Sequence, residues 1–253
     1  MESRYDGIAD WYDTEFQPLP LQSETWDVLL RLLDGEPVGA LIDVGCGTGG
    51  FAAGLVARGW EVTGTDVSED MLRRAHAKGI RVVRADAASL PFADASFDGA
   101  MSVFTHTDLD DFRAVVGEVA RVLRPATPFA YVGAHPCFVG PHSTYDVERG
   151  LPELHTGWYR RTGRYTEAPG ISRSSDSLRM RVGASHLPLA AFLQRSSMSA
   201  FSWNGSTSPP SASTRTSLRC AGADEQRRSL TRNARSPGPA FAKGPGRGRA
   251  MSG

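Results

Sequence analysis

The chain has 253 residues and a formal net charge of zero, with 28 basic side chains balanced by 28 acidic ones. This length suffices for one large or two small domains with a buried core, and no run reaches the ~18 apolar residues of a membrane-spanning helix. The first residues lack the apolar stretch of a secretory signal, and three cysteines are too few for a disulfide framework. These features favour a cytoplasmic protein that is not inserted in a membrane.

The charges are unevenly distributed along the chain. Residues 1–194 hold 26 of the acidic side chains, whereas residues 195–253 hold ten basic and two acidic ones. The second segment is rich in Ser, Arg, Gly and Pro without any period, a composition typical of disorder. We therefore predict a folded body at 1–194 and a basic, disordered tail at 195–253, for which nucleic-acid binding is a weak alternative because no RNA-binding module is recognisable.

Short apolar runs alternate with segments of helical periodicity between residues 26 and 134. This alternation indicates right-handed βαβ crossovers, and hence a Rossmann-like α/β fold with a doubly wound, mostly parallel sheet and helices on both faces. Ligands of such sheets bind beyond the carboxyl ends of the strands. In chain order the pattern predicts a helix at 25–34, a strand at 39–45, a helix at 51–59, strands at 60–66, 80–86, 96–104 and 128–135, and helices at 68–79 and 108–125.

Local signals refine some of these elements. Ser68 is placed to cap the helix at 68–79, and Pro125 ends the helix at 108–125. Residues 135–187 are aromatic and rich in turns, which predicts an insertion on the substrate side of the sheet, and residues 186–194 again have the spacing of an amphipathic helix.

The stretch LIDVGCGTGG at residues 41–50 follows the first predicted strand and is compatible with two cofactors. Glycines at this turn let the backbone approach a ligand closely, and Asp66 at the end of the next strand is placed to hold a ribose. Both features suit a dinucleotide as well as S-adenosylmethionine. Asp43 separates the two, because a carboxylate repels a pyrophosphate but attracts a cationic sulfonium and ammonium. The charge pattern therefore favours S-adenosylmethionine over a nicotinamide cofactor.

Four motifs in order, LIDVGCGTGG, VTGTDVSEDML, RADAASLPFADASFDGAMS and VARVLRP, resemble those of the class I S-adenosylmethionine-dependent methyltransferases, close to the type-11 group of small-molecule enzymes. The N-terminal YDGIADWYD is also similar to the start of members of that group. The resemblance covers roughly residues 5–134. It implies methyl transfer by in-line displacement to a small-molecule acceptor, with S-adenosylmethionine as cofactor.

The resemblance also assigns the cofactor-binding residues. It implies a loop around the methionine moiety, an acid for the ribose, contacts to the adenine and an aromatic lid. The residues are Asp43, Gly45, Cys46, Gly47 and Gly49 for the loop, Asp66 for the ribose, Val67, Asp86 and Ala87 for the adenine, and Tyr12 or Tyr5 for the lid. Cys46 is better explained by small packing volume than by nucleophilic chemistry.

The chain departs from the family in two places. RPAT at 124–127 replaces the usual RPGG, so that Ala126 stands where glycine would take a positive φ more easily. The family completes its sheet with two antiparallel strands, six and seven, and no such strands are readable after Gln194, so we expect them to be missing or disrupted. Back-translation of residues 196–207 with GC-rich codons gives an apolar-rich alternative in another frame, which favours a frameshift near Gln194 over a native tail.

Methyl transfer depends mainly on positioning, and a base is needed only if the acceptor must lose a proton. His106 and His135 follow the strands at 96–104 and 128–135 and are the candidate bases, with Asp108 to orient them. Each also has a structural alternative: His106 could begin the next helix, with Thr107 or Asp108 as its cap, and His135 could shape a turn.

Other constellations carry less chemistry. His135, Cys137 and His142 match no zinc-ligand spacing, so no metal site is predicted. Trp158, Tyr159 and Tyr165 either roof an apolar acceptor or cover the sheet. Two further functions stay open: a cofactor-binding domain with little or no turnover, because its sheet is incomplete, and an NAD-type Rossmann oxidoreductase.

Overall fold

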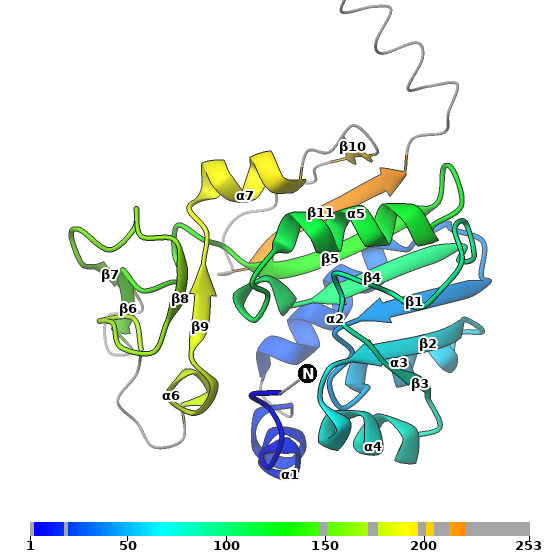
Figure 1. Cartoon of the computed structure of the whole chain (residues 1–253), viewed down its shortest axis with the longest axis horizontal. Coiled ribbons are helices and arrows are strands. Elements are labelled where there is room, and N and C mark those ends of the chain that lie inside the picture. The colour runs from blue at the N-terminus through cyan, green and yellow to red at the C-terminus, as the bar shows by residue number, and fades with distance from the viewer. Residues whose placement is uncertain are drawn as a thin grey trace, which may run out of the picture.

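The computed structural model describes residues 3–17, 20–146, 151–171, 177–196, 201–204 and 213–220. Its centre is a seven-stranded sheet with the order β10-β11-β5-β4-β1-β2-β3 (Figure 1). The first five strands in the chain pair in parallel, which confirms the predicted doubly wound α/β fold. These strands are β1 (Ala40–Val44), β2 (Glu61–Asp66), β3 (Arg81–Arg84), β4 (Gly99–Val103) and β5 (Pro128–Ala134).

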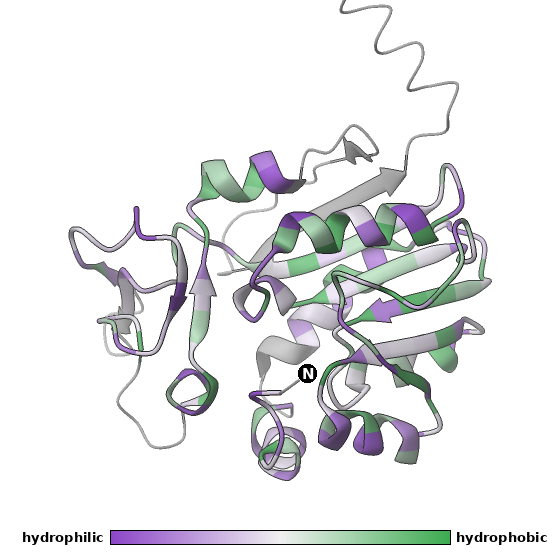
Figure 2. Ribbon diagram, in the orientation of Figure 1, coloured by the Kyte–Doolittle hydropathy of each residue, from purple (hydrophilic) through white to green (hydrophobic). Residues whose placement is uncertain are grey.

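Side chains alternate between two buried cores on the two faces of this sheet. Ile42, Ala100 and Phe129 face a core shared with α5 (Phe112–Val122) and α7 (Leu189–Ser196). Their neighbours Leu41, Met101 and Ala130 face a second core. This core is covered by α2 (Pro20–Leu32), α3 (Gly50–Val56) and α4 (Glu69–Ala77). Figure 2 shows α4 as mainly hydrophilic on its visible side and α5 with alternating hydrophilic and hydrophobic bands, the mixture expected of helices that bury one face on a sheet.

The helix N-termini show which predicted caps form. Ser68 Oγ accepts the N–H of Met71 at 3.2 Å, which confirms the predicted cap of α4. The cap of α5 is Asp111, whose Oδ1 accepts the N–H groups of Arg113 and Ala114. The suggestion that Thr107 or Asp108 caps this helix was therefore wrong, because the carboxylate next to the first helical turn supplies the bonds instead.

The helix α5 also ends before the predicted boundary. Leu123 is already extended, and Arg124 donates its N–H to Phe97 O at 2.9 Å, so the chain leaves the helix before Pro125. The following turn places Ala126 at φ +66°, in the left-handed region that glycine adopts without strain. This is the position where the sequence has alanine in place of the family's glycine.

Residues 135–187 form a small region beside the carboxyl end of β5, drawn to the left of the sheet in Figure 1. It holds the hairpin of β6 (Ser143–Asp146) with β7 (Leu151–Leu154). A second antiparallel pair joins β8 (Gly163–Tyr165) to β9 (Ala184–His186), and α6 (Leu178–Val182) precedes β9. This region packs on the 3-10 turn η2 (Thr105–Thr107) that follows β4.

The expectation that the last two strands are missing was wrong. β10 (Phe201–Asn204) pairs antiparallel with β11 (Ser213–Cys220), and β11 pairs antiparallel with β5 from Ala134 to Pro128. Strand pairing is made by main-chain N–H and C=O groups. A strand whose sequence lacks apolar alternation can therefore still pair with the open edge of β5. Apart from Arg195 and Ser196 at the end of α7, the rest of the predicted tail lies outside the described residues. In the part of the chain that the structure describes, no helix is long and apolar enough to cross a membrane.

Candidate cofactor and acceptor site

The glycine loop joins β1 to α3 at the carboxyl edge of the sheet. Gly45, Gly47 and Gly49 have φ values of +75°, +53° and +76°, conformations that side chains rarely adopt. The N–H groups of Gly45 and Cys46 donate to Thr65 O at 2.8 and 2.9 Å, which ties the loop to the end of β2. The glycines are therefore required by the backbone, as the sequence predicts.

Asp66, at the end of β2, binds this loop directly. Its Oδ2 accepts the N–H of Gly47 at 3.0 Å, and its Oδ1 accepts the N–H of Ser68 at 2.9 Å. Burial raises the pKa of Asp66, whereas these N–H groups oppose the shift. Two main-chain donors thus fix the carboxylate beside the loop, where a ribose would meet it.

Asp43 lies at the base of the loop and is almost completely buried, with 3% of its surface exposed. Burial, and then the nearby Asp66, raise the pKa of Asp43 to about 8. A cation beside this carboxyl would favour its charged form. Burial also raises the pKa of Cys46, whose Sγ fills the space beside Gly64 in the second core, so this thiol packs rather than reacts.

The residues predicted to meet the adenine lie at the ends of β2 and β3. Val67 follows Asp66 and its carbonyl accepts a bond from Arg84 Nε at 3.0 Å. Asp86 is exposed, and its Oδ1 accepts the N–H of Ala88 at 2.9 Å, which shapes the turn after β3. Ala87, which follows Asp86, is half-buried. All three lie on the same edge of the sheet as Asp66.

An N-terminal lead, residues 3–17, crosses this edge; it contains α1 (Ala9–Trp11) and the π-helix η1 (Tyr12–Phe16). Tyr5 and Tyr12 pack edge to face at 6.0 Å. Burial raises the pKa of both tyrosines, and that of Tyr12 responds to Asp66 as well as to Asp108. The charge of Asp108 thus acts on both predicted lid tyrosines, and that of Asp66 on Tyr12.

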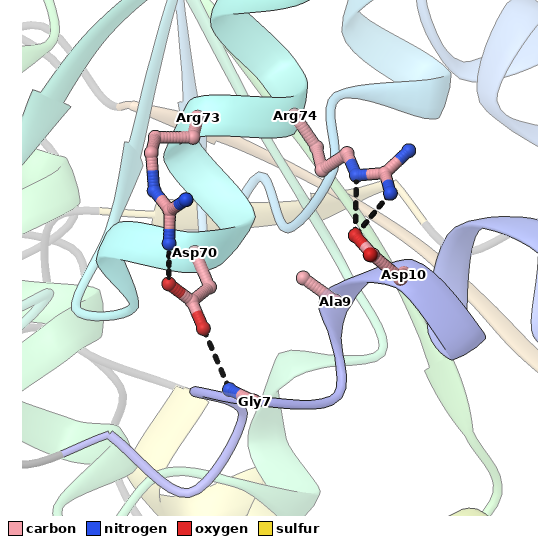
Figure 3. A pocket seen from close by; sticks show the side chains of 6 residues that line it. All are labelled: Gly7, Ala9, Asp10, Asp70, Arg73 and Arg74. Atoms are coloured by element: carbon pink, nitrogen blue, oxygen red, sulfur yellow. Dashed lines mark hydrogen bonds and ion pairs between the residues drawn. The ribbon is translucent and has the colours of Figure 1, made fainter.

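Polar contacts hold the lead against α4. Figure 3 shows a hollow along this seam, where Asp70 accepts the N–H of Gly7 at 2.6 Å and Arg74 pairs with Asp10. The residues that line it are Gly7, Ala9, Asp10, Asp70, Arg73 and Arg74. Deeper in the seam, Lys78 Nζ pairs with Asp13 and donates to Thr48 O at 2.9 Å, so it links the lead to the glycine loop.

The turn after β4 closes the other side of the loop. Phe104 has a φ of +57°, a strained conformation for a bulky residue, and Thr105 begins the turn η2. Ser102 Oγ lies 2.6 Å from Thr105 Oγ1 and donates to Val44 O at 2.8 Å. This pair of bonds connects β4, the turn and the start of the glycine loop.

His106 is buried in an aromatic cluster with Phe112, Tyr131 and Phe192. Its Nδ1 is hydrogen-bonded to the Tyr131 hydroxyl. Burial, and then the charge of Arg179, lower the pKa of His106 to about 3. A buried imidazole with so low a pKa is a poor proton acceptor, so His106 fits a structural role better than that of a general base.

His135 is also engaged locally. Its Nδ1 accepts the N–H of Cys137 at 3.2 Å, and its ring packs on Phe138 at 5.0 Å. Burial lowers its pKa. The bond to Cys137 favours the turn-shaping alternative, since it occupies the nitrogen that would accept a proton.

Arg179 was not singled out from the sequence, yet it reaches the turn after β4 from α6. Nη1 donates to Asp108 Oδ1 at 2.9 Å and Nη2 donates to Thr107 Oγ1 at 2.6 Å. Arg4 from the lead donates to Asp108 O at 3.5 Å. Asp108 therefore connects the lead, the turn after β4 and the insertion. No signal in the sequence identifies Arg179, because it is one of several arginines in 160–181 and belongs to no periodic pattern or motif.

The three aromatic residues of the insertion, Trp158, Tyr159 and Tyr165, make different contacts. Tyr165 lies near Arg179 and Asp108, which both influence its pKa. The Tyr159 hydroxyl accepts the N–H of Leu189 at 3.0 Å, and Trp158 stacks with Arg161. Over the described ranges of the chain, no group of three His, Cys, Asp or Glu side chains is arranged to hold a metal ion.

The chain is similar in sequence to known methyltransferases. Residues 42–130 match the profile of a methyltransferase domain. The chain is 33% identical over 152 residues to malonyl-[acyl-carrier protein] O-methyltransferase of Pseudescherichia vulneris, covering 59% of this chain and 55% of that protein. It is 36% identical over 143 residues to O-methyltransferase resE of Aspergillus sclerotiorum, covering 49% and 54%. The chain thus spans about half the length of these curated relatives.

Solved structures share the fold over a larger part of the chain. An S-adenosylmethionine-dependent methyltransferase from Mesorhizobium loti aligns with a TM-score of 0.63 at 22% identity, covering 77% of this chain and 96% of that one. A methyltransferase of the same description from Listeria monocytogenes aligns with a TM-score of 0.61 at 19% identity, covering 79% and 99%. At these identities the likeness concerns the fold.

Proposed function

We propose, from the premise that residues 42–130 belong to the class I S-adenosylmethionine-dependent methyltransferases, that the chain transfers a methyl group to a small-molecule acceptor. S-adenosylmethionine is the cofactor of this family, and the curated relatives include O- and C-methyltransferases. The acceptor and the atom that is methylated are matters of proposal, since the matched region is only half of each relative.

The observation that carries the proposal is the pair of carboxyls around the glycine loop. Asp66 is held by two main-chain N–H groups in a position to accept ribose hydroxyls. Asp43 lies beneath the loop, where burial makes its charge costly unless a cation is near. A sulfonium nucleoside brings both a ribose and positive charge to this loop, whereas a dinucleotide brings two phosphates.

Methyl transfer mainly requires that the donor and the acceptor are correctly positioned. The glycine loop with Asp43 and Asp66 would hold S-adenosylmethionine, which would supply a methyl group on a cationic sulfur for in-line transfer to a nucleophilic atom of the acceptor. The chain's part is to align donor and acceptor and to exclude water. Tyr5 and Tyr12 of the lead cover the loop side, while Asp108 and Arg179 border the acceptor side.

Titration calorimetry with S-adenosylhomocysteine tests the cofactor assignment. We expect binding by the full chain and a loss of about tenfold or more for Asp66→Ala, because the ribose loses its acceptor. Asp94→Ala is the matched control, since Asp94 is exposed and pairs with Arg121 far along the chain from the loop. Binding of NADH without binding of S-adenosylhomocysteine would overturn the proposal in favour of a nicotinamide-dependent enzyme.

Turnover is tested separately, with labelled S-adenosylmethionine and a metabolite extract. Transfer of label to a small molecule distinguishes an enzyme from a domain that binds the cofactor without reaction. The antiparallel strands β10 and β11 favour the enzyme, because they complete the sheet beside the acceptor region.

A further inference from the structure

Arg179 lies where the insertion meets the central sheet, and one edge of its guanidinium is fully engaged. Nη1 donates to Asp108 Oδ1 and, at 3.3 Å, to Gly183 O. Nη2 donates to Thr107 Oγ1, and that hydroxyl also donates to Asp108 Oδ2 at 3.2 Å. The two Nη atoms therefore hold the group against the turn after β4.

The other edge, formed by Nε and Nη2, is not engaged in the same way. Nε of Arg179 donates to none of the residues that the structure describes. A quarter of the side chain is exposed. Since a guanidinium is a rigid planar fork, it can hold one carboxylate at each edge, and Asp108 takes only one of them.

Three tyrosines lie within reach of the charge of Arg179. Tyr5, Tyr12 and Tyr165 come from the lead and from β8, and the charge of Arg179 acts on each of them. The charge of Asp66 acts on Tyr12 as well, and Tyr12 packs edge to face on Tyr5 at 6.0 Å. An acceptor bound at Arg179 would meet a positive group and these nearby aromatic rings.

The chemistry of the candidate bases points the same way. His106 is buried with Nδ1 bonded to Tyr131, and His135 Nδ1 is occupied by Cys137 N–H. At the ends of β4 and β5, therefore, both histidines have Nδ1 engaged in local bonds, an arrangement that favours an acceptor that needs no base. A carboxylic acid is already ionised near neutral pH and needs no base.

We propose, resting on the methyltransferase function above, that the acceptor is a small aromatic or apolar carboxylic acid whose carboxylate binds side-on to Nε and Nη2 of Arg179. Arg179 is then the residue that determines acceptor specificity. The tyrosines pack on the apolar body of the acid, and Asp108 and Thr107 keep the guanidinium in place.

The test measures binding of two matched pairs to the protein loaded with S-adenosylhomocysteine: benzoate against benzyl alcohol, and 3-phenylpropanoate against 3-phenylpropanol. We expect each acid to bind at least about tenfold more tightly than its alcohol. Arg179→Gln should remove this preference, and Arg179→Lys, which keeps the charge without the fork, should reduce it. Arg113→Gln, at an exposed position of α5, should preserve it.

The loading step separates the two proposals. Failure to bind S-adenosylhomocysteine contradicts the methyltransferase function itself. If the cofactor product binds but acids and alcohols bind equally, or neither acid binds at millimolar concentration, the carboxylate proposal is overturned. Retention of the full acid preference in folded Arg179→Gln or Arg179→Lys overturns the role of Arg179.

Discussion

The methyl group of Thr105 occupies the space that a side chain on Gly45 would need. Gly45 also has a positive φ, so a larger residue meets both backbone strain and steric overlap. Gly47 has a positive φ with open space around it. A side chain at Gly47 would therefore cost only backbone strain, whereas one at Gly45 would cost both strain and steric overlap.

We expect Gly45→Ala to destabilise the chain by roughly 3 kcal/mol and Gly47→Ala by about 1 kcal/mol, measured by chemical denaturation. Thr105→Ser removes the overlapping methyl but keeps the hydroxyl that contacts Ser102. The double variant Gly45→Ala with Thr105→Ser should thus regain part of the loss. Equal costs at the two glycines would contradict the packing argument.

The pH dependence of cofactor binding should report on Asp43. Its pKa of about 8 lies above the ordinary value near 3.9, so without ligand the carboxyl is protonated at neutral pH. The resulting contribution to stability is full below pH ~4 and is lost as pH rises through about 8, so the melting temperature should fall across that window. Asp43→Asn should flatten this slope, and a slope unchanged in Asp43→Asn would rule out Asp43 as its source.

A bound cation should make the Asp43 carboxyl prefer its ionised form. Binding of S-adenosylmethionine lowers the pKa of Asp43, so a proton is released at pH 7 and affinity rises between pH 6 and 8. Calorimetry in buffers of different ionisation enthalpy measures that proton. The amino group of the ligand titrates near the same pH, so the difference between wild type and Asp43→Asn is the quantity to compare.

His106 should act on stability more than on catalysis. We expect His106→Gln to lower the melting temperature by several degrees, because it disturbs rings packed from Phe112 and Phe192. The kcat of the folded variant should stay within about tenfold of wild type, whereas loss of a general base costs 10²–10⁴-fold. Tyr131→Phe is the companion variant, since it removes only the partner of Nδ1. A kcat reduced a thousandfold in folded His106→Gln would restore His106 as the base.

The N-terminal lead should control cofactor release through Lys78. This ammonium joins Asp13 of the lead to Thr48 O beside the glycine loop. Lys78→Met should speed the dissociation of S-adenosylhomocysteine by roughly tenfold in stopped-flow measurements, as one partly buried charged link is lost. Arg124→Met, which removes the surface pair with Asp98 before β4, should leave the rate unchanged. Equal rates in both variants would mean that the lead does not retain the cofactor.

Some features of the molecule follow from the sequence because local and global signals agree. The strands β1, β4 and β5 are short, mostly apolar runs followed by turn residues. Ser68 marks the start of α4 because its hydroxyl accepts the N–H of Met71. The glycine loop and Asp66 meet because parallel strands end at one edge. The cofactor side was therefore predictable, although its residue roles stay proposals.

Other features depend on contacts that no local pattern encodes. The strands β6 to β9 have three or four residues each and no usable period. Arg179 matters because α6 brings it to Asp108, 71 positions earlier in the chain. The strands β10 and β11 could not be predicted from apolar alternation, because the pairing of β11 with β5 and of β10 with β11 is made by main-chain groups.

The C-terminal hairpin gives the last prediction. The register of β11 runs from Ser213 opposite Ala134 to Arg219 opposite Pro128, which covers the edge of β5. Hydrogen exchange should therefore show protected amides within 213–220 and 128–134 in the full chain. A chain ending at Ser196 should lose protection in β5 and melt lower, because it exposes an unpaired buried strand. Rapid exchange throughout 201–220 would support the disordered tail instead. The coding DNA decides its origin, since an early stop in the alternative frame excludes a frameshift near Gln194.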